Sequence, residues 1–187
     1  MTESKIYPGM ISSEIEMFVV ENELKVIQGG KVSSFAELPY ATFQLLREAI
    51  ASDEEVQTHL LIMHPSSEYR RIEQFAKCRF GGLDFKGDIC NETGTMQDGE
   101  YWDCPLRGNC QSEGVLCKMP KVGTERLTTS EIRIIQLSTT DKTNEVIAEE
   151  MNLALGTFHK SKQNIYERLQ ITTKQCLTKF AMSMNLI

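Results

Sequence analysis

The sequence predicts an α+β protein in three parts. Residues 15–36 alternate apolar and polar positions around a Gly-Gly pair, as in a small strand meander, and helical patterns follow up to residue 77. Five of the six cysteines then fall within residues 78–120. From residue 121 onward, apolar residues recur at helical spacing. We therefore expect an N-terminal strand and helix module of unknown role (1–77), a Cys-rich loop module (78–120) and a C-terminal all-α helix-turn-helix domain (121–187).

Length and composition indicate an ordinary globular protein. The chain has 187 residues and a formal net charge of −6, which suits one or two domains with hydrophobic cores. No apolar run approaches the roughly 20 residues that a membrane span needs. The first ten residues, MTESKIYPGM, lack the apolar region of a signal peptide. The sequence therefore predicts a cytoplasmic protein, without membrane contact, whose cysteines are normally reduced.

The meander is expected to consist of short strands joined by tight turns. Glu21-Asn22 can form one turn, and Gly29-Gly30 is a strong two-residue hairpin signal. An alternative is a helix from Ser12, where a capping box is also present, but the alternation favours strands. The expected strands are residues 15–20, 23–27 and 31–35.

Three helices should follow the strands. Pro39 can pre-set the first turn of a helix over residues 40–51, and Asp53 can cap a second helix that ends near Ile62. Ser66 or Ser67 can cap a third helix through Ala76. His59 and His64 fit core and loop positions better than ligand positions, and nothing in this module indicates catalysis.

The cysteine-rich module has too few apolar residues to build a core of its own. Glycines are also frequent in it, so its loops need a cross-link to hold them together. In a reducing compartment, a metal ion bound by thiolates can provide that cross-link. We expect structural zinc. The preferred ligand set is Cys90, Cys104, Cys110 and Cys117, with Cys78 as the alternate.

Two alternatives to zinc stay open. The cysteines are widely spaced, whereas a zinc ribbon has paired C-x-x-C knuckles, and wide spacing also suits an iron–sulfur cluster. The thiols could also carry no ligand, or form disulfides after purification. A cysteine nucleophile needs a nearby base, and no histidine lies in this module. The sequence therefore predicts no enzyme activity.

The C-terminal domain shows start and stop signals for short helices. Thr128 and Glu131 have the spacing of a capping box. Thr143 or Asn144 can cap a second helix. Asn152 suits the left-handed residue that ends this helix, and a third helix should then run from about residue 155 to 169.

The third helix has two distinct sides. Phe158 and Ile165 mark an apolar side, which also carries Ser161 and Leu169. The opposite side carries His159, Lys160, Gln163 and Glu167. Lys and Gln can bind base edges in a major groove, so the helix fits a DNA-recognition helix. An ordinary three-helix bundle with a solvated polar face is the alternative that periodicity alone leaves open.

This segment resembles the LuxR-type (GerE-like) helix-turn-helix family of transcriptional regulators. The order and spacing of the family's pattern hold over about the last third of the chain. Three departures occur, because Ser130, Ala154 and Ser161 stand where the family usually has Arg, Ser and His. The matching motifs are Leu127-Thr128…Glu131…Ile134-Ile135, then Ile147-Ala148…Met151…Leu153…Thr157-Phe158, then Asn164-Ile165…Arg168-Leu169.

The resemblance implies a set of DNA-binding residues. Thr157 and Arg168 would contact phosphate, and His159, Lys160 and Gln163 would face bases. Lys162 lies near the buried edge, so its ammonium group should reach toward phosphate or water. The full expected set is Thr157, His159, Lys160, Lys162, Gln163, Asn164 and Arg168.

The expected function is sequence-specific transcription regulation on double-stranded DNA. Residues 121–187 carry a net charge of +2, whereas residues 1–120 carry −8, which fits a DNA-binding tail. The resemblance also suggests a homodimer through the C-terminal helix, with the alternative that this helix only completes the core of its own domain. A contact with RNA polymerase is a further candidate. The alternative function is a sigma-factor-like or adaptor protein that uses the same helices against a protein partner.

Overall fold

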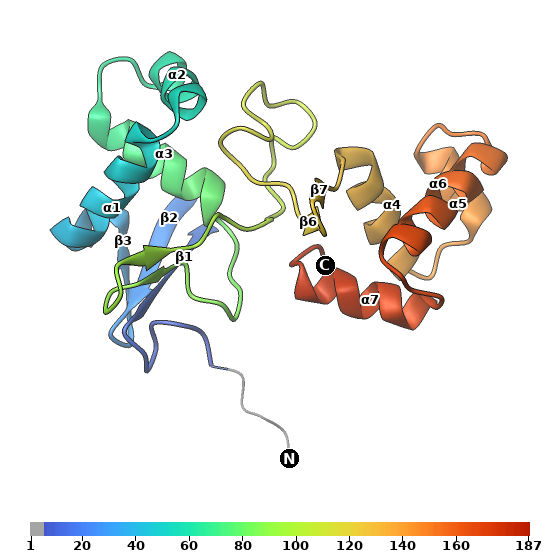
Figure 1. Cartoon of the computed structure of the whole chain (residues 1–187), viewed down its shortest axis with the longest axis horizontal. Coiled ribbons are helices and arrows are strands. Elements are labelled where there is room, and N and C mark those ends of the chain that lie inside the picture. The colour runs from blue at the N-terminus through green and yellow to red at the C-terminus, as the bar shows by residue number, and fades with distance from the viewer. Residues whose placement is uncertain (1–5) are drawn as a thin grey trace. The chain divides into compact units, whose positions relative to one another are not determined.

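The computed structural model describes residues 6–187, and the chain divides into two compact units, Met1–Lys118 and Met119–Ile187. The first unit combines a sheet with helices, and the second is mainly helical (Figure 1). The predicted α+β class is therefore confirmed, with the helix-rich part at the C-terminus. No helix among residues 6–187 is both long and apolar enough to cross a membrane.

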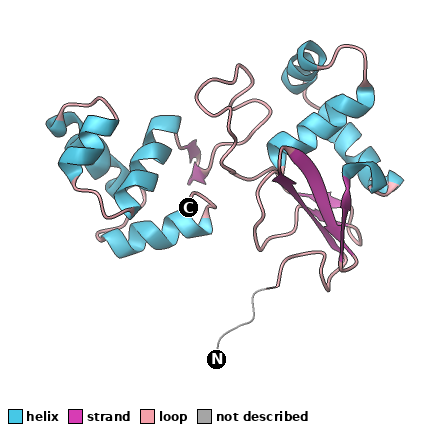
Figure 2. Ribbon diagram, turned by 180° about the vertical axis from the view of Figure 1, so that it is seen from behind, coloured by secondary structure: helices cyan, strands magenta, loops and turns pink. Residues whose placement is uncertain are grey.

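The N-terminal unit contains a five-stranded antiparallel sheet in the order β3-β2-β1-β4-β5 (Figure 2). Glu21 and Asn22 have φ angles of 51° and 66°, and Gly29 and Gly30 have 57° and 76°, as two-residue hairpin turns require. Both predicted turns and the three predicted strands are therefore confirmed. The strands are β1 (Glu14–Val20), β2 (Glu23–Gln28), β3 (Lys31–Ser34), β4 (Ile89–Cys90) and β5 (Thr95–Met96).

The helices of this unit start at the predicted caps. The Asp53 carboxylate accepts hydrogen bonds from the amides of Glu55 and Val56, both at 3.1 Å, and Ser67 Oγ accepts from the Arg70 amide at 3.3 Å. Phe35 lies in a short 3₁₀ turn rather than in the third strand. The elements are η1 (Phe35–Glu37), α1 (Tyr40–Ala51), α2 (Glu54–Met63) and α3 (Glu68–Arg79).

Residues 78–118 share the core of the N-terminal unit. Strand β4 pairs with β1, where Ile15 lies opposite Ile89, and β5 pairs with β4. Ile89 and Leu116 are 1% and 0% exposed and belong to the same apolar cluster as Ile15 and Phe75. The sequence predicts a separate module here, but this segment completes the sheet that begins at residue 14.

The C-terminal unit begins with a short hairpin. Strands β6 (Lys121–Val122) and β7 (Glu125–Arg126) pair in antiparallel fashion, and four helices follow. Its core is built from apolar residues of all four helices, including Ile135, Ile147, Phe158 and Leu177. The helices are α4 (Thr129–Thr139), α5 (Asn144–Glu150), α6 (Leu155–Arg168) and α7 (Lys174–Ser183).

Candidate nucleic-acid interface and cysteine pocket

The start of α4 is fixed by the predicted capping box. The Glu131 amide donates to Thr128 Oγ1 at 3.2 Å, and the Thr128 amide donates back to Glu131 Oε2 at 2.8 Å. Although burial opposes it, hydrogen bonds from the Thr128 amide and Arg168 hold the pKa of Glu131 below its ordinary value. The carboxylate therefore stays ionised at neutral pH.

The joint between α5 and α6 sets the orientation of α6. Thr143 caps α5 through the Val146 amide at 3.5 Å. Asn152 adopts φ 53°, and the Leu153 amide donates to the Ala148 carbonyl at 2.9 Å, which closes the end of α5 in a Schellman-type turn. The predicted cap and left-handed residue are both confirmed. No side chain caps the start of α6, because Ala154 occupies the N-cap.

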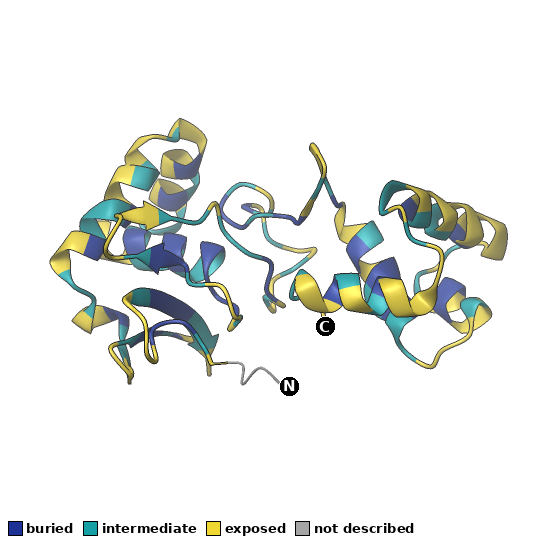
Figure 3. Cartoon of the chain, turned by 60° about the horizontal axis from the view of Figure 1, so that its bottom comes forward, coloured by how far each residue is buried: buried dark blue, intermediate teal, exposed yellow. Residues whose placement is uncertain are grey.

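Helix α6 buries one side and exposes the other. Phe158 and Ile165 are 0% and 1% exposed and dock the helix on the rest of the unit. Figure 3 shows the same alternation of buried and exposed positions along the helices of both units. Five of the seven expected DNA-binding residues are exposed on α6, namely Thr157, His159, Lys160, Gln163 and Asn164.

The centre of the exposed side of α6 carries two hydrogen-bond donors, Lys160 and Gln163, and one carboxylate, Glu167. Within residues 6–187, no carboxylate lies within ion-pair distance of Lys160, so its ammonium group is available to a ligand. Gln163 Nε2 donates to Glu167 Oε1 at 2.8 Å. One turn of helix thus presents a cation and an amide together, which are the groups that contact guanine and adenine edges.

The remaining two expected residues have partners inside the unit. The Lys162 ammonium donates to Asn144 Oδ1 at 2.9 Å and lies 5.8 Å from the centre of the Phe158 ring. Arg168 Nη2 lies 2.9 Å from Glu131 Oε1, so this ion pair connects the end of α6 to the start of α4. Both side chains therefore connect α6 to another helix of the unit, Lys162 to α5 and Arg168 to α4.

The last helix places its cysteine on the surface. Thr173 caps α7 through the Cys176 amide at 3.2 Å. Leu177 and Ala181 are 1% and 0% exposed and fill the core, whereas Cys176 is exposed. The neighbouring Leu177 takes the inward position and leaves Cys176 on the surface.

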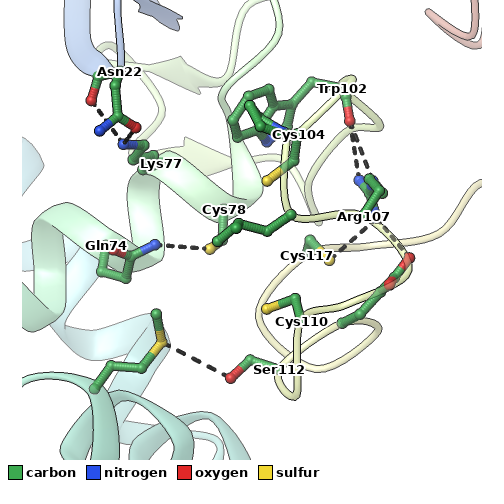
Figure 4. Close-up of a pocket in the computed structure, with 14 residues that line it drawn as sticks. Asn22, Gln74, Lys77, Cys78, Trp102, Cys104, Arg107, Cys110, Ser112 and Cys117 are labelled. Carbon is green, nitrogen blue, oxygen red and sulfur yellow. Dashed lines mark hydrogen bonds and ion pairs between the residues drawn. The ribbon is translucent and has the colours of Figure 1, made fainter.

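A second candidate site is a pocket of about 360 Å³ within the N-terminal unit. Four thiols point into this pocket, as Figure 4 shows. They belong to Cys78 in the last turn of α3 and to Cys104, Cys110 and Cys117 in the loop after β5. Cys90 does not line the pocket; it lies in β4, opposite Glu14 and Thr95. Of the five predicted cysteines, the structure brings together the alternate and three of the preferred four.

Polar donors of the pocket wall point at two of the sulfurs. Gln74 Nε2 lies 3.2 Å from Cys78 Sγ, and Arg107 Nη1 lies 3.3 Å from Cys117 Sγ. The Gly114 amide lies 3.4 Å from the same Cys117 sulfur. Desolvation by burial raises the pKa of Cys78 to about 11, so this thiol has little thiolate at neutral pH and is a poor nucleophile.

The cysteine loop is attached to α3 by a buried arginine. Arg79 is 7% exposed and donates from Nε to the Leu116 carbonyl at 2.7 Å and from Nη1 to the Asp98 carbonyl at 2.6 Å. Its guanidinium also lies 4.9 Å from the centre of the Phe75 ring. Sequence reasoning missed this residue, because an Arg at the end of a helix ordinarily serves as a surface charge.

A third group of ionisable residues lies where β1 meets the loop after α3. Glu16, Asp84 and Glu100 each place a carboxylate oxygen within 4.8 Å of the other two. Desolvation by burial raises the pKa of Glu16 to about 8, although a hydrogen bond from the Asp84 amide opposes the shift. Desolvation by burial, together with the negative charge of Asp84, raises the pKa of Glu100 to about 10. Both groups hold a proton at neutral pH. These acids come from distant parts of the sequence, so spacing gave no signal for them.

Comparison with known proteins identifies a family for the C-terminal part of the chain only. Residues 125–181 match the family model described as bacterial regulatory proteins, luxR family. Neither a curated protein nor a solved structure was found to match the chain significantly. The matched range contains α4, α5, α6 and most of α7, so the C-terminal unit carries the helix-turn-helix domain of a DNA-binding transcription regulator.

Proposed function

We propose, from the LuxR-type helix-turn-helix domain at residues 125–181, that this chain regulates transcription by reading a specific duplex sequence with α6 in the major groove. The observation that carries the proposal is the exposed side of α6. It presents Lys160 and Gln163 on the side opposite the buried Phe158 and Ile165. The helix can therefore enter a groove without disturbing its own packing.

Contacts within the unit support distinct roles for the polar residues. Lys160 and Gln163 supply base contacts, while Thr157, His159 and Asn164 flank them on exposed positions. Lys162 and Arg168, which bind Asn144 and Glu131, set the angle at which α6 meets the duplex. The positive net charge of residues 121–187 favours the approach to phosphate.

The proposal is tested by DNA affinity of the full chain. A binding sequence is first selected from a random duplex pool. Lys160→Ala and Gln163→Ala should each weaken binding to that sequence by about 1–3 kcal/mol, because each removes a base contact. Binding of Gln163→Ala to random duplex should stay unchanged, since the amide carries no charge.

Matched controls come from exposed positions of the N-terminal unit. Lys31→Ala and Gln57→Ala remove the same functional groups from positions outside the C-terminal unit, and both should retain affinity within about twofold. Unchanged affinity of both α6 variants would reject α6 as the reading helix.

A salt titration separates DNA binding from the alternative function. Affinity for duplex DNA should fall steeply with salt as bound phosphates replace counterions. A sigma-factor-like or adaptor protein that contacts RNA polymerase through these helices would show no duplex binding, even at low salt.

We also propose that two copies bind together through α7. Met182 is 64% exposed on the outer side of this helix, opposite the buried Leu177 and Ala181. Two copies related by a twofold axis would read half-sites about one helical turn apart. Sedimentation of the full chain should then show a dimer that Met182→Glu dissociates, with wild-type circular dichroism. A monomer at all concentrations would contradict this arrangement.

A further inference from the structure

We propose that Cys78, Cys104, Cys110 and Cys117 bind an iron–sulfur cluster in the pocket of the N-terminal unit. The four thiols converge on one space although the chain separates Cys78 from the other three by most of a loop and two strands (Figure 4). All six cysteines of the chain are free thiols, so none of these sulfurs is committed to a disulfide. Four thiolates form the complete ligand set of a [2Fe–2S] or [4Fe–4S] cluster.

The spacing of the sulfurs distinguishes a cluster from a single metal ion. A tetrahedral zinc site with Zn–S bonds of about 2.3 Å holds its sulfurs about 3.8 Å apart. Within residues 6–187, the only set of three ligand atoms lying within 4.8 Å of one another belongs to Glu16, Asp84 and Glu100. No three of the four sulfurs therefore all lie within 4.8 Å of one another, and the pocket volume of about 360 Å³ exceeds what one ion fills. A cluster bridges these wider separations, because its four thiolates bind different irons, one on each iron of a [4Fe–4S] cluster or two on each iron of a [2Fe–2S] cluster.

The wall of the pocket has the chemistry that a cluster needs. The Gln74 side chain, the Arg107 guanidinium and the Gly114 amide all point N–H groups at ligand sulfurs, at 3.2–3.4 Å. Such donors offset the negative charge of thiolates and sulfides and tune the reduction potential of a cluster. Trp102, which is 9% exposed, and Met63 add apolar surface that limits access of water.

The donors themselves are held rigidly. Arg107 also donates to the Trp102 carbonyl at 3.2 and 3.3 Å, and its guanidinium lies 4.3 Å from the centre of the Tyr101 ring. Glu113 lies 3.6 Å from Arg107 and accepts from the Gly108 amide at 2.7 Å. The loop that carries three of the thiols is thus ordered by its own polar contacts, so a cluster would meet a largely preformed site. This inference uses the N-terminal unit alone and does not depend on DNA binding.

The test is metal and sulfide analysis of the full chain after anaerobic purification and anaerobic reconstitution with ferrous iron and sulfide. We expect a coloured protein with stoichiometric iron and acid-labile sulfide and with visible absorbance that bleaches on reduction. Cys78→Ser, Cys104→Ser, Cys110→Ser and Cys117→Ser should each lose most of the bound iron. Cys90→Ser and Cys176→Ser are the matched controls and should bind iron as the wild type does.

Two further measurements keep the outcome clear if a serine variant misfolds. Circular dichroism identifies variants that have lost the fold, and those are set aside. Gln74→Leu removes one N–H donor to Cys78 without removing a thiol, so the reconstituted variant should keep its iron while its reduction potential becomes more negative.

Two results would overturn the proposal. The first is a reconstituted wild type that holds one zinc per chain and neither iron nor sulfide. The second is a cluster that Cys90→Ser removes and Cys78→Ser retains.

Discussion

The two units of this chain are stabilised in different ways. In the C-terminal unit, the start of α4 and the joint between α5 and α6 are closed by residues a few positions apart, Thr128 with Glu131 and Ala148 with Leu153, and the ion pair of Arg168 with the distant Glu131 adds to these local contacts. In the N-terminal unit, the decisive contacts join distant segments: Arg79 binds the carbonyl of Leu116, 37 residues away. Local contacts can be recognised in a sequence, whereas distant contacts to backbone carbonyls leave no pattern.

This difference fits the two roles that we propose, DNA reading for the C-terminal unit and cluster binding for the N-terminal unit. A DNA-reading unit needs one rigid helix presented at a fixed angle, and short-range caps with an apolar core supply that. A ligand pocket needs thiols from separate segments, and long-range polar contacts bring them together. The predictions that follow test whether the two units respond independently to changes in each kind of contact.

The largest effect should come from removing the long-range arginine. Arg79→Ala leaves the carbonyls of Leu116 and Asp98 without their buried donor and removes the contact with Phe75, so we expect a loss of about 3 kcal/mol in the unfolding free energy of the N-terminal unit. Urea unfolding followed by circular dichroism should show the transition of the N-terminal unit at lower urea concentration, with the transition of the C-terminal unit unchanged.

Arg47→Ala is the matched control for this change. It removes an arginine whose ion pair with Glu68 is exposed, and such pairs contribute under about 1 kcal/mol. Equal losses of unfolding free energy in Arg79→Ala and Arg47→Ala would contradict the view that long-range contacts stabilise the N-terminal unit.

A smaller effect, opposite in sign, should come from the buried carboxyls. The pKa values of Glu16 and Glu100 are raised to about 8 and 10, so the folded chain holds protons that the unfolded chain releases above about pH 4.5. The N-terminal unit should therefore lose stability as the pH rises from about 5 through 8 and toward 10. Glu100→Gln, whose amide oxygen can still accept from the Gly82 amide, should stabilise the unit by about 2 kcal/mol at pH 8.

Calorimetry between pH 5 and pH 9 measures this effect. The melting temperature of the N-terminal unit should fall with pH in the wild type and fall less in Glu100→Gln. The exposed Glu92→Gln is the control and should follow the wild type. A wild-type melting temperature that rises over this range would rule out proton uptake by these carboxyls on folding.

The smallest effect should come from a local cap. Thr128→Ala removes the hydroxyl that accepts from the Glu131 amide, which should cost the C-terminal unit about 1 kcal/mol. Thr128→Ser restores that acceptor and should recover most of the loss, while alanine at the exposed Thr172 should change little. If Thr128→Ala shifts the transition of the N-terminal unit instead, the units are not independent.

Local chemistry made much of the fold predictable. The turns at Glu21-Asn22 and Gly29-Gly30, the caps Asp53 and Thr128 and the left-handed Asn152 all act within a few residues of the chain. Residue spacing also found the exposed side of α6, since the helical period alone determines which residues share a face.

Long-range pairing explains what the sequence did not predict. Strands β4 and β5 have two residues each, too few for an alternation to show, and they form only because β1 offers a partner. The exchange of Cys90 for Cys78 at the pocket has the same origin: the register of β4 places Cys90 in the sheet, while the end of α3 brings Cys78 to the loop. The partners of Lys162 and Arg168 likewise lie on other helices.

Trp102 gives the N-terminal unit an optical signal of its own. It is the only tryptophan in the chain, it is 9% exposed, and its indole packs so closely on Gly81 that a Cβ there would lie 2.4 Å from the ring. Tryptophan emission therefore reports on this unit alone, because the C-terminal unit contains Tyr166 but no tryptophan. Because the indole also borders the pocket, quenching of that emission would follow the arrival of a bound chromophore in the intact protein, without any added label.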